Sequence, residues 1–508
     1  MTLLAIAACL VAAGLAGLRW LRVAQREHYY PGACSQFALR WWFGLGFNRL
    51  LAVVILANVV LTVVSPFFAL LVAIPVGVGP FGLRLRGTAP GPLRWTRRVK
   101  TLAGVWAGIS AVVVIAGWLA GVGAFAAALM AALAPLVVDA ALAITRPVEA
   151  SLAQRFVDEA TRKLRSINPT VIAITGSYGK TGTKGYAAHL IEGSRTVVPT
   201  PASFNNAAGL ARAINESLPP GTEVFVAEMG TYGPGEIAEL CKWVRPQISA
   251  ITAIGPVHLE RMKTEENITR AKSEIFDTAE TAVLNVDNDH LAGLVEELTA
   301  KGKKVVRCSA SDPAADVYVG FEGEQLVVRV AGDEVARYED AGDVLPTNVA
   351  VATALALEVG VPAAAIAERL PTLPVARNRR EIVTGSTGAT FIDDTYNSNP
   401  AGARAALASL QRYAAGANRS VVVTPGMIEL GPRQADENER FAAGASEVAT
   451  DVVIIGSTNR KALTAGAHQG RARVHYVDDR AGATAWVKEN TSAGDVVLFE
   501  NDLPDHFP

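Results

Sequence analysis

Cysteine is scarce in this chain of 508 residues. Its four cysteines are Cys9, Cys34, Cys241 and Cys308, and no two of them form a Cys-x-x-Cys pair. Widely spaced cysteines are typical of a reducing compartment and argue against a zinc site, an iron–sulfur site or a disulfide scaffold. The chain also lacks internal repeats, and it has no low-complexity tract beyond its richness in alanine.

Acidic residues are nearly absent from the first 150 residues. Twelve Arg and Lys residues are balanced there by only Glu27, Asp139 and Glu149, a net charge of 12 − 3 = +9, whereas the whole chain carries −1 and the remainder therefore −10. The same region contains long apolar stretches at about 2–18, 51–82 and 101–144. Because a bilayer span needs ~20 apolar residues, the sequence predicts a membrane domain over residues 1–150.

Breaks within these stretches predict about five transmembrane helices. The stretch 51–82 is too long for one helix and contains Pro66, so we expect a hairpin of two short spans. The stretch 101–144 divides near residues 121–123. The first stretch is followed by arginines rather than preceded by them, which favours a retained anchor over a signal peptide.

Basic residues at 19–49 and 84–100 predict the orientation of the membrane domain. If both segments obey the positive-inside bias, the N-terminus lies outside and the chain from about Arg146 onward lies in the cytosol. The charges of the second segment are explained either by topology alone or by binding of an anionic lipid or pyrophosphate headgroup. Asp139 lies inside the last span or near its interface, and the sequence assigns it no role.

A phosphate-binding loop opens the remaining part of the chain. It follows the short apolar run 171–174 and precedes a helix-like segment. Backbone N–H groups and the helix N-terminus can surround a phosphate there, Lys180 can reach the β and γ oxygens, and Thr181 can hold Mg²⁺. The loop is shorter than the full Walker pattern, because Ile174 stands where that pattern has glycine. The candidate ATP-binding residues of the loop are Gly176, Ser177, Gly179, Lys180, Thr181 and Gly182.

Polar residues follow the apolar runs 224–227, 248–254 and 282–285, which alternate with helical stretches. Such alternation predicts an α/β fold with a parallel sheet, whose ligands bind at the carboxyl ends of the strands. Glu228, His258 and Asn285 come at such ends. A carboxylate and an imidazole beside a phosphate loop suit a Mg²⁺ site, although a single histidine is also common as a structural residue.

Five motifs in succession resemble the central domain of the Mur ligases. They are residues 176–184, 200–206, 228–237, 258–260 and 271–276, and further similarity at 392–400 and 426–431 extends the resemblance over about 171–435. Within the family they are most similar to the type that adds D-alanyl-D-alanine to a UDP-muramoyl tripeptide. The resemblance implies a P-loop central domain at 151–373 and a Rossmann-like C-terminal domain at 374–508.

The resemblance also implies ATP-dependent amide synthesis through an acyl phosphate, with two Mg²⁺ sites. The implied catalytic residues are Lys180, His258, Lys272 and Glu228, and the implied metal ligands are Thr181, Glu228, His258 and Lys272. In this family the lysine at position 272 is commonly carbamylated; the alternative is an ordinary lysine on a helix surface. The resemblance also implies nucleotide contacts for Asn285, Arg379, Asp394 and Asn397. Arg380 is an alternative to Arg379. The segment 393–400 could alternatively be a simple turn, since asparagine and proline favour turns for local reasons.

Two departures from the family pattern concern the substrates. The first is that membrane spans replace the UDP-binding domain of the family. The second is that residues 499–505 carry three acids in place of a lysine-glycine-serine-like ending, and these acids favour a cationic or amine-rich acceptor. We expect a multi-pass membrane protein with its catalytic domains in the cytoplasm, membrane lipid as a partner and no nucleic acid. The substrates are a muramoyl peptide and a D-alanyl-D-alanine-like dipeptide, or else a lipid-linked or polymeric acceptor of the polyglutamate type. A transporter is disfavoured because no Leu-Ser-Gly-Gly signature occurs, and an idle scaffold because the site residues are intact.

Overall fold

The structure is a computed structural model that describes residues 1–44, 46–85, 92–201, 204–339, 344–374, 381–385, 387–396, 398–503 and 506–507. The chain forms two units, Met1–Ala153 with Leu503–Pro508, and Gln154–Asp502. The first boundary falls inside a single long helix, α7. The expected divisions at residues 150 and 374 stay predictions.

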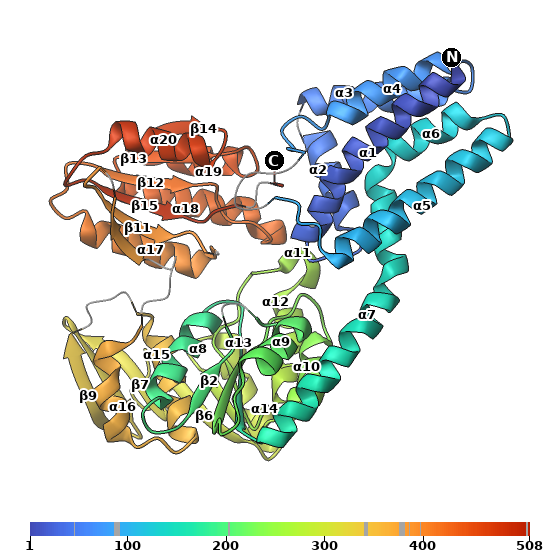
Figure 1. Cartoon of the computed structure of the whole chain (residues 1–508). Helices are drawn as coiled ribbons and strands as arrows, with labels where there is room; N and C mark the ends of the chain where they lie inside the picture. The colour runs from blue at the N-terminus through green and yellow to red at the C-terminus, as the bar shows by residue number, and fades with distance from the viewer. Residues whose placement is uncertain are drawn as a thin grey trace. The chain divides into compact units, whose positions relative to one another are not determined.

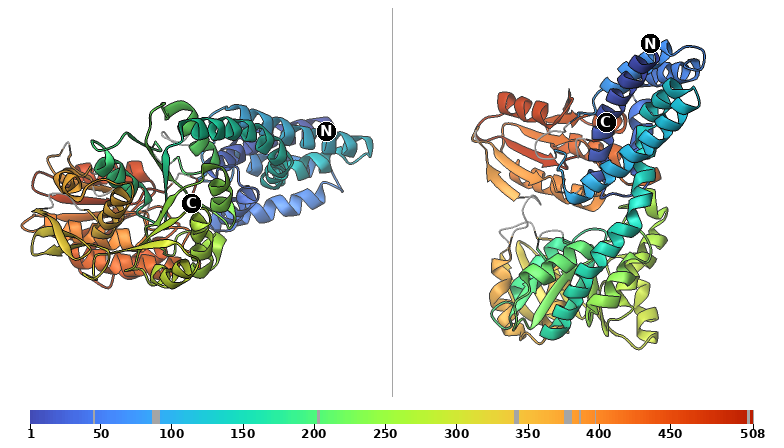
Figure 2. Two further views of the ribbon diagram at one scale, coloured as in Figure 1. Left: turned by 90° about the horizontal axis from the view of Figure 1, so that it is seen from below. Right: turned by 45° about the vertical axis from the view of Figure 1, so that its right-hand side comes forward.

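The first unit is helical (Figure 1, Figure 2). Its helices are α1 (Thr2–Arg26), α2 (Ala33–Gly44), α3 (Gly46–Leu61), α4 (Phe67–Val78), α5 (Arg97–Leu119), α6 (Gly123–Ala132) and the first part of α7 (Ala134–Ile167). Helix α1 packs against α4 and α6 through alanine and other small side chains. A Cβ atom on Gly17 would lie 2.4 Å from the ring of Trp106, so this close approach requires glycine.

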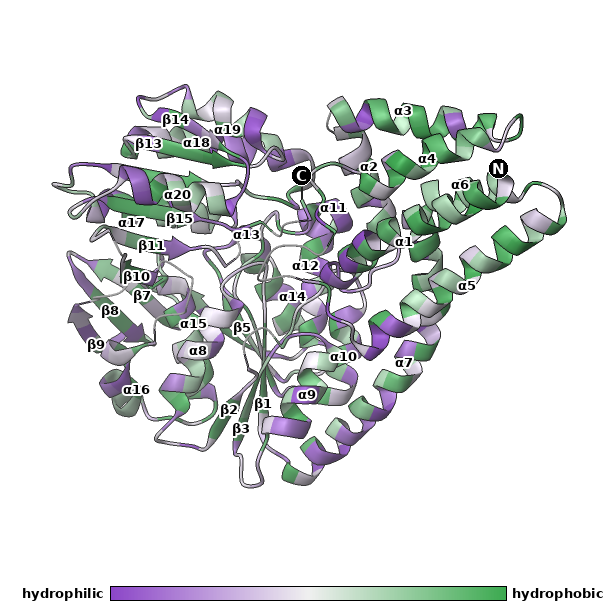
Figure 3. Ribbon diagram, turned by 45° about the horizontal axis from the view of Figure 1, so that its top comes forward, coloured by the Kyte–Doolittle hydropathy of each residue, from purple (hydrophilic) through white to green (hydrophobic). Residues whose placement is uncertain are grey.

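Hydrophobic residues dominate these helices, as the green ribbons of α4 and α6 show in Figure 3. Among the described residues, two helices, α1 and α5, are long and apolar enough to cross a membrane, and up to four spans result if the bent pairs α2–α3 and α6–α7 each count as one. The predicted breaks near Pro66 and residues 121–123 do separate helices. The expectation of about five spans is not supported, because α4 has only 12 residues and a span needs ~20.

Asp139 has a structural partner that the sequence did not reveal. Its carboxylate accepts hydrogen bonds from the backbone N–H groups of Cys34 at 3.2 Å and Ser35 at 2.8 Å, and from the Ser35 hydroxyl at 2.5 Å. These N–H groups belong to the first turn of α2, where no intrahelical acceptor exists. The acid in the long helix α7 therefore caps another helix of the same unit.

The C-terminal tail belongs to the first unit. The indole N–H of Trp41 donates to the backbone oxygen of His506 at 2.8 Å, and Nε2 of His506 lies 2.9 Å from Oε1 of Glu27. The rings of His506 and Phe507 pack on Phe37. His506 is buried, so the tail is an integral part of this helical unit.

The second unit contains a nine-stranded sheet in the order β2-β3-β1-β4-β5-β6-β7-β8-β9. The strands are β1 (Thr170–Thr175), β2 (Val197–Pro199), β3 (Val224–Glu228), β4 (Ile248–Ile251), β5 (Thr281–Asn285), β6 (Lys304–Ser309), β7 (Val317–Glu322), β8 (Gln325–Val330) and β9 (Asp333–Glu339). Strands β1 to β7 pair in parallel, and β8 and β9 are antiparallel. The order changes direction at β1, so the phosphate-binding loop lies at the switch point where such sheets bind ligands.

Both faces of this sheet are covered by helices. Alternate residues of each strand point to opposite faces and so enter two separate cores. One core joins strand residues such as Val171 to the end of α7, to α9 (Ala207–Ser217), α10 (Glu236–Val244), α11 (Leu259–Met262), α12 (Glu265–Ser273) and α14 (Leu294–Ala300). The other joins residues such as Ile172 to α8 (Lys180–Ile191), α15 (Pro346–Glu358) and α16 (Ala363–Arg369). Burial on both faces explains why the strands are apolar throughout.

A six-stranded sheet follows in the order β10-β11-β15-β12-β13-β14. Its strands are β10 (Glu381–Thr384), β11 (Thr390–Asp394), β12 (Ser420–Thr424), β13 (Asp451–Ile455), β14 (Arg473–Val477) and β15 (Val496–Glu500), and its helices are α17 (Pro400–Tyr413), α18 (Gln434–Val448), α19 (Arg460–Ala467) and α20 (Arg480–Asn490). All of its strands except β10 pair in parallel. The predicted α/β fold with two sheet-containing domains is confirmed.

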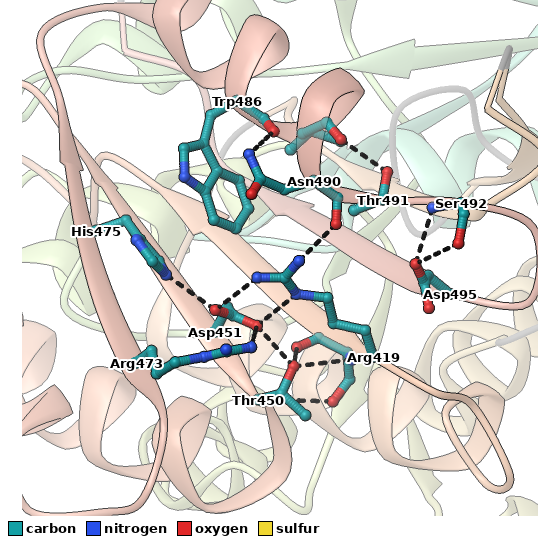
Figure 4. Close-up of polar contacts among 12 residues, drawn as sticks. Arg419, Thr450, Asp451, Arg473, His475, Trp486, Asn490, Thr491, Ser492 and Asp495 are labelled. Atoms are coloured by element: carbon teal, nitrogen blue, oxygen red, sulfur yellow. Dashed lines mark hydrogen bonds and ion pairs between the residues drawn. The ribbon is translucent and has the colours of Figure 1, made fainter.

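A polar cluster closes the amino ends of this second sheet (Figure 4). Asp451 is fully buried and accepts hydrogen bonds from Arg419, Arg473, His475 and Thr450 at 2.7–3.0 Å. The aromatic rings of His475 and Trp486 lie 4.5 Å apart beside it. The cluster holds three neighbouring strands together at the edge opposite the strand carboxyl ends.

Candidate active site

The phosphate-binding loop joins β1 to α8. A Cβ atom on Gly176 would lie 2.0 Å from the hydroxyl of Thr252, and one on Gly179, which has φ +85°, would lie 2.6 Å from Oδ1 of Asn348. Both positions therefore require glycine. The hydroxyl of Ser177 exchanges hydrogen bonds with the backbone of Gly255 at 3.1–3.2 Å, which ties the loop to the end of β4.

Lys180 is the first residue of α8 and folds back over the loop. Its Nζ lies 2.5 Å from the backbone oxygen of Gly176 and 3.4 Å from that of Ser177. The ammonium group therefore lies directly over the loop whose N–H groups suit a phosphate. Gly182 lies two residues further along α8, where a Cβ atom would lie 3.6 Å from Nδ2 of Asn348.

Glu228 ends β3 and lies beside the loop, because it pairs in register with Ile174 of β1. Its carboxylate accepts hydrogen bonds from the Thr181 hydroxyl at 3.0 Å and the Asn205 amide at 3.1 Å, and forms an ion pair with Lys184 at 3.0 Å. Burial opposes ionisation of Glu228, but Lys184 and Lys180 outweigh it and hold its pKa below the ordinary 4.5. The group is therefore a carboxylate at neutral pH.

Thr181 and Glu228 together suit one Mg²⁺ ion. Mg²⁺ binds one or two protein oxygens together with water and substrate phosphates. A hydroxyl and an ionised carboxylate 3.0 Å apart at the end of a phosphate-binding loop offer that donor set. Within the described residues, no group of three or more His, Cys, Asp or Glu side chains is placed to hold a metal.

Lys272 is a buried lysine of α12. It is 2% exposed. Burial, together with the nearby charge of Lys180, lowers its pKa well below 10.5. The alternative of an ordinary surface lysine is therefore wrong.

His258 follows β4 and precedes α11. Its Nδ1 lies 2.5 Å from Oε2 of Glu429, a residue of the C-terminal sheet domain. The ring of Tyr232 packs edge-on against the imidazole at 5.1 Å. The sequence did not indicate this carboxylate partner, which lies 171 residues away.

Asn285 ends β5 and takes part in the wall of the site. Its amide donates to the backbone oxygen of Thr252 at 2.9 Å, and the Thr252 hydroxyl donates to the backbone oxygen of Tyr178 at 2.5 Å. Asn348, at the start of α15, lies against the loop glycines and was not predicted as a site residue. The spacing of a lone asparagine carries no signal of such a contact.

Asp394 is the C-terminal candidate that the structure describes. Asp394 ends β11 beside Glu500 of β15, and its backbone oxygen accepts from the N–H of Asn501 at 3.1 Å. Arg379, its alternative Arg380, and Asn397 lie outside the described residues. Their roles stay predictions.

Of the three acids that favoured a cationic or amine-rich acceptor, Glu500 is buried, Asp502 is exposed, and Asp505 lies outside the described residues. Glu500 is fully buried and accepts hydrogen bonds from the hydroxyls of Thr424 at 2.7 Å and Ser398. Burial raises its pKa to about 8, against the effect of the Thr424 bond and with a further contribution from Asp394. Asp502 lies 3.6 Å from the guanidinium of Arg480. The interpretation of a cation-binding ending is therefore wrong for Glu500 and weakened for Asp502.

Comparison with known proteins identifies both sheet domains. The family model for the Mur ligase middle domain matches residues 174–356, and that for the Mur ligase, glutamate ligase domain, matches residues 378–500. A UDP-N-acetylmuramoyl-tripeptide–D-alanyl-D-alanine ligase of Mycobacterium leprae is 32% identical over 365 residues, which cover 65% of this chain and 70% of the relative. The Bacillus subtilis ligase of the same name is 29% identical over 342 residues, 66% of this chain and 74% of that one.

Solved structures share the same fold. MurF from Acinetobacter baumannii matches with a TM-score of 0.60 and 24% identity over 69% of this chain and 77% of that one. The MurF ligase from Thermotoga maritima, solved in complex with ADP, matches with a TM-score of 0.59 and 23% identity over 69% and 80%. The resemblance inferred from the motifs is confirmed: the chain belongs to the Mur ligase family and is an ATP-dependent ligase that forms amide bonds.

Proposed function

We propose that this ligase joins a D-alanyl-D-alanine-like dipeptide to the free carboxylate of a muramoyl peptide during peptidoglycan synthesis. The observation that carries the proposal is a phosphate-binding loop with a buried, ionised Glu228 at its end. The chain is 32% identical to a UDP-N-acetylmuramoyl-tripeptide–D-alanyl-D-alanine ligase, and the match covers 70% of that relative. A peptide carboxylate attacks the γ-phosphorus of ATP and ADP leaves. The dipeptide amine then attacks the acyl carbon, and phosphate and a proton leave.

The residues of the loop act mainly by positioning positive charge, which is the chief demand of phosphoryl transfer. Lys180 neutralises the β and γ oxygens, and the loop N–H groups bind the phosphates. Thr181 and Glu228 hold one Mg²⁺, which supplies further charge neutralisation on the transferring oxygens. His258 and Lys272 are proposed to serve a second metal position. Burial lowers the pKa of Lys272 and so favours the unprotonated amine, the form that reacts with carbon dioxide, which supports its proposed carbamylation.

We further propose that the first unit anchors the enzyme in a membrane, with the ligase unit in the cytosol. Large apolar side chains are exposed on this unit, as at Leu3 (73%) of α1, Val64 (80%) between α3 and α4, and Leu119 (76%) of α5, where water would be unfavourable. The basic residues Arg94, Arg97 and Lys100 lie just before or within the start of α5, which suits a cytosolic membrane surface. Separation of membranes from cytosol, followed by carbonate extraction, tests the anchor; release into the soluble fraction would contradict it.

A lipid-linked or polymeric acceptor is the second candidate, favoured by the apolar first unit. Full-length protein in detergent is incubated with ATP and Mg²⁺ and either UDP-muramoyl tripeptide plus D-alanyl-D-alanine, or a lipid-linked acceptor, while phosphate release and product mass are measured. Amide product with the first pair supports the proposal, and product with only the second acceptor selects the alternative. Lys180→Ala is the control, and ligation that persists in it would contradict the assigned site.

A further inference from the structure

Glu429 contacts His258 from a different domain of the same unit. It lies in the segment 426–431 that follows β12, whereas His258 follows β4. The side chain of His258 is 22% exposed and that of Glu429 is 26% exposed, and Nδ1 of His258 lies 2.5 Å from Oε2 of Glu429. Because an ionised Glu429 carboxylate can only accept, Nδ1 of His258 carries the proton in this contact, and in the neutral imidazole Nε2 is left as the acceptor or ligand atom.

The backbone holds both residues in a costly conformation. His258 has φ 65° and Glu429 has φ 64°, in the left-handed region that costs non-glycine residues about 1–3 kcal/mol each. Such conformations persist where the surroundings impose them and are frequent at functional sites. The geometry of this pair is therefore built into two loops rather than reached by mobile surface side chains.

The segment that carries Glu429 is itself firmly held. The backbone N–H of Met427 donates to Asn438 at 2.7 Å, and its backbone oxygen accepts from Asn438 at 2.9 Å and Asn459 at 3.0 Å. Both asparagines are buried. Gly431 lies close to Leu259, the residue after His258, since a Cβ atom there would lie 3.2 Å from the Leu259 Cβ.

An ion pair links the same segment to the helix of Lys272. Arg433 lies 2.5 Å from Glu265 at the start of α12, and Glu265 also contacts His290 at 3.0 Å. Residues 429–433 therefore contact the two elements that carry His258 and Lys272. Only the Glu429 contact reaches a proposed site residue directly, which makes Arg433 a matched control.

We propose that Glu429 is a positioning residue that acts through His258, holding the imidazole with its proton on Nδ1 and Nε2 as the ligand atom while the two domains are in contact. This rests on the role proposed above for His258. Carboxylates that bind the far nitrogen of a ligating histidine commonly change metal affinity or activity by about 10–100-fold. Closure of the C-terminal domain would thus complete the site by orienting one of its ligands.

The test compares Glu429→Ala, Glu429→Gln and Arg433→Ala in the full-length protein. The chain has seven histidines, so ¹⁵N-histidine NMR, assigned with His258→Asn, reports the tautomer of His258 directly. We expect Glu429→Ala to lose the Nδ1–H tautomer, to weaken Mn²⁺ binding in the presence of ADP about 10–100-fold, and to lower kcat by a similar factor with little change in KM for ATP. Glu429→Gln retains an acceptor oxygen and should restore the tautomer and part of kcat.

Arg433→Ala removes a contact between the same two domains without touching His258, and should change these quantities less than about 3-fold. Equal effects of Glu429→Ala and Arg433→Ala, or an unchanged tautomer in Glu429→Ala, would overturn the proposal. The tautomer and Mn²⁺ measurements need no acceptor substrate. A wild-type protein that fails to ligate muramoyl peptide therefore refutes the proposed function without deciding the role of Glu429.

Discussion

The buried pair Glu228–Lys184 should be decisive for stability as well as for catalysis. The two side chains are 1% and 6% exposed, and Nζ lies 3.0 Å from Oε2. At that distance and an effective dielectric constant of about 20, their attraction is about 5 kcal/mol. Removing one partner leaves the other charge buried, which costs about 3–5 kcal/mol. We expect Glu228→Gln and Lys184→Met each to destabilise the central domain by this amount.

The double variant separates the two roles of Glu228. With both charges removed, the penalty of an unpaired buried charge disappears, so the loss in Glu228→Gln/Lys184→Met should be smaller than the sum of the single losses by at least about 2 kcal/mol. Ligase activity should not return, because the carboxylate proposed to hold Mg²⁺ is still missing. Recovery of stability without recovery of activity is the expected signature.

Urea-dependent hydrogen exchange in peptides covering β1 and β3 measures the local free energy of unfolding of this domain. The pH dependence provides a further check: the pKa of Glu228 in the folded protein lies below 4.5, so its contribution is present above 4.5 and is lost as the pH falls through the folded value. Glu228→Gln should lack this acid-dependent loss. Single losses that add within about 0.5 kcal/mol would show that the pair is not coupled and would refute the reasoning.

Three further changes test other parts of the molecule. Burial opposes ionisation of Asp451, but its hydrogen bonds, chiefly the one from Arg419, hold its pKa below 3.8. Asp451→Asn should therefore lower the free energy of unfolding by about 3 kcal/mol at neutral pH, measured by hydrogen exchange in β13. The variant should also lack the loss of stability that the wild type shows as the pH falls below 3.8. Burial raises the pKa of Glu500 from 4.5 to about 8, so the contribution of the protonated carboxyl to stability is full below pH 4.5 and is lost as the pH rises to about 8. The free energy of unfolding of Glu500→Gln, measured in urea, should match that of the wild type at pH 4 and exceed it by about 5 kcal/mol at pH 9. Trp41→Phe removes the donor to the His506 carbonyl, and carboxypeptidase should then release the C-terminal tail faster than from the wild type.

The central sheet could be predicted from sequence because its signals are local. The apolar runs at 171–174 and 224–227 became β1 and β3, and both faces of these strands are buried, as continuous apolar runs indicate. Glu228 could be placed beside the loop because parallel strands bring their carboxyl ends to one edge. The antiparallel strands β8 and β9 were not foreseen. Of the two, β9 is a half-exposed edge strand, and such strands have a weaker hydrophobic pattern.

Contacts between distant segments account for most of what the sequence did not reveal. The partners of Asp139 lie on α2, more than 100 residues earlier, and the side chain was left without a role because nothing nearby in the sequence could bind it. The same holds for His258 and Glu429, each of which belongs to a recognisable motif. A motif identifies the residue type at a position, whereas the partner depends on how two separately folded elements meet.

Glu500 shows why formal charge is a poor guide to acceptor specificity in this chain. The three acids within residues 499–505 suggested a cationic or amine-rich acceptor. The strand that ends at Glu500 is buried on both faces, however, and strand geometry sends its final side chain inward to the hydroxyls of Thr424 and Ser398. With its pKa at about 8, Glu500 is uncharged at neutral pH and cannot attract a cation there. Recognition of the incoming amine must therefore depend on groups other than this carboxyl, and charge reversal at Glu500 is the wrong experiment for changing the acceptor.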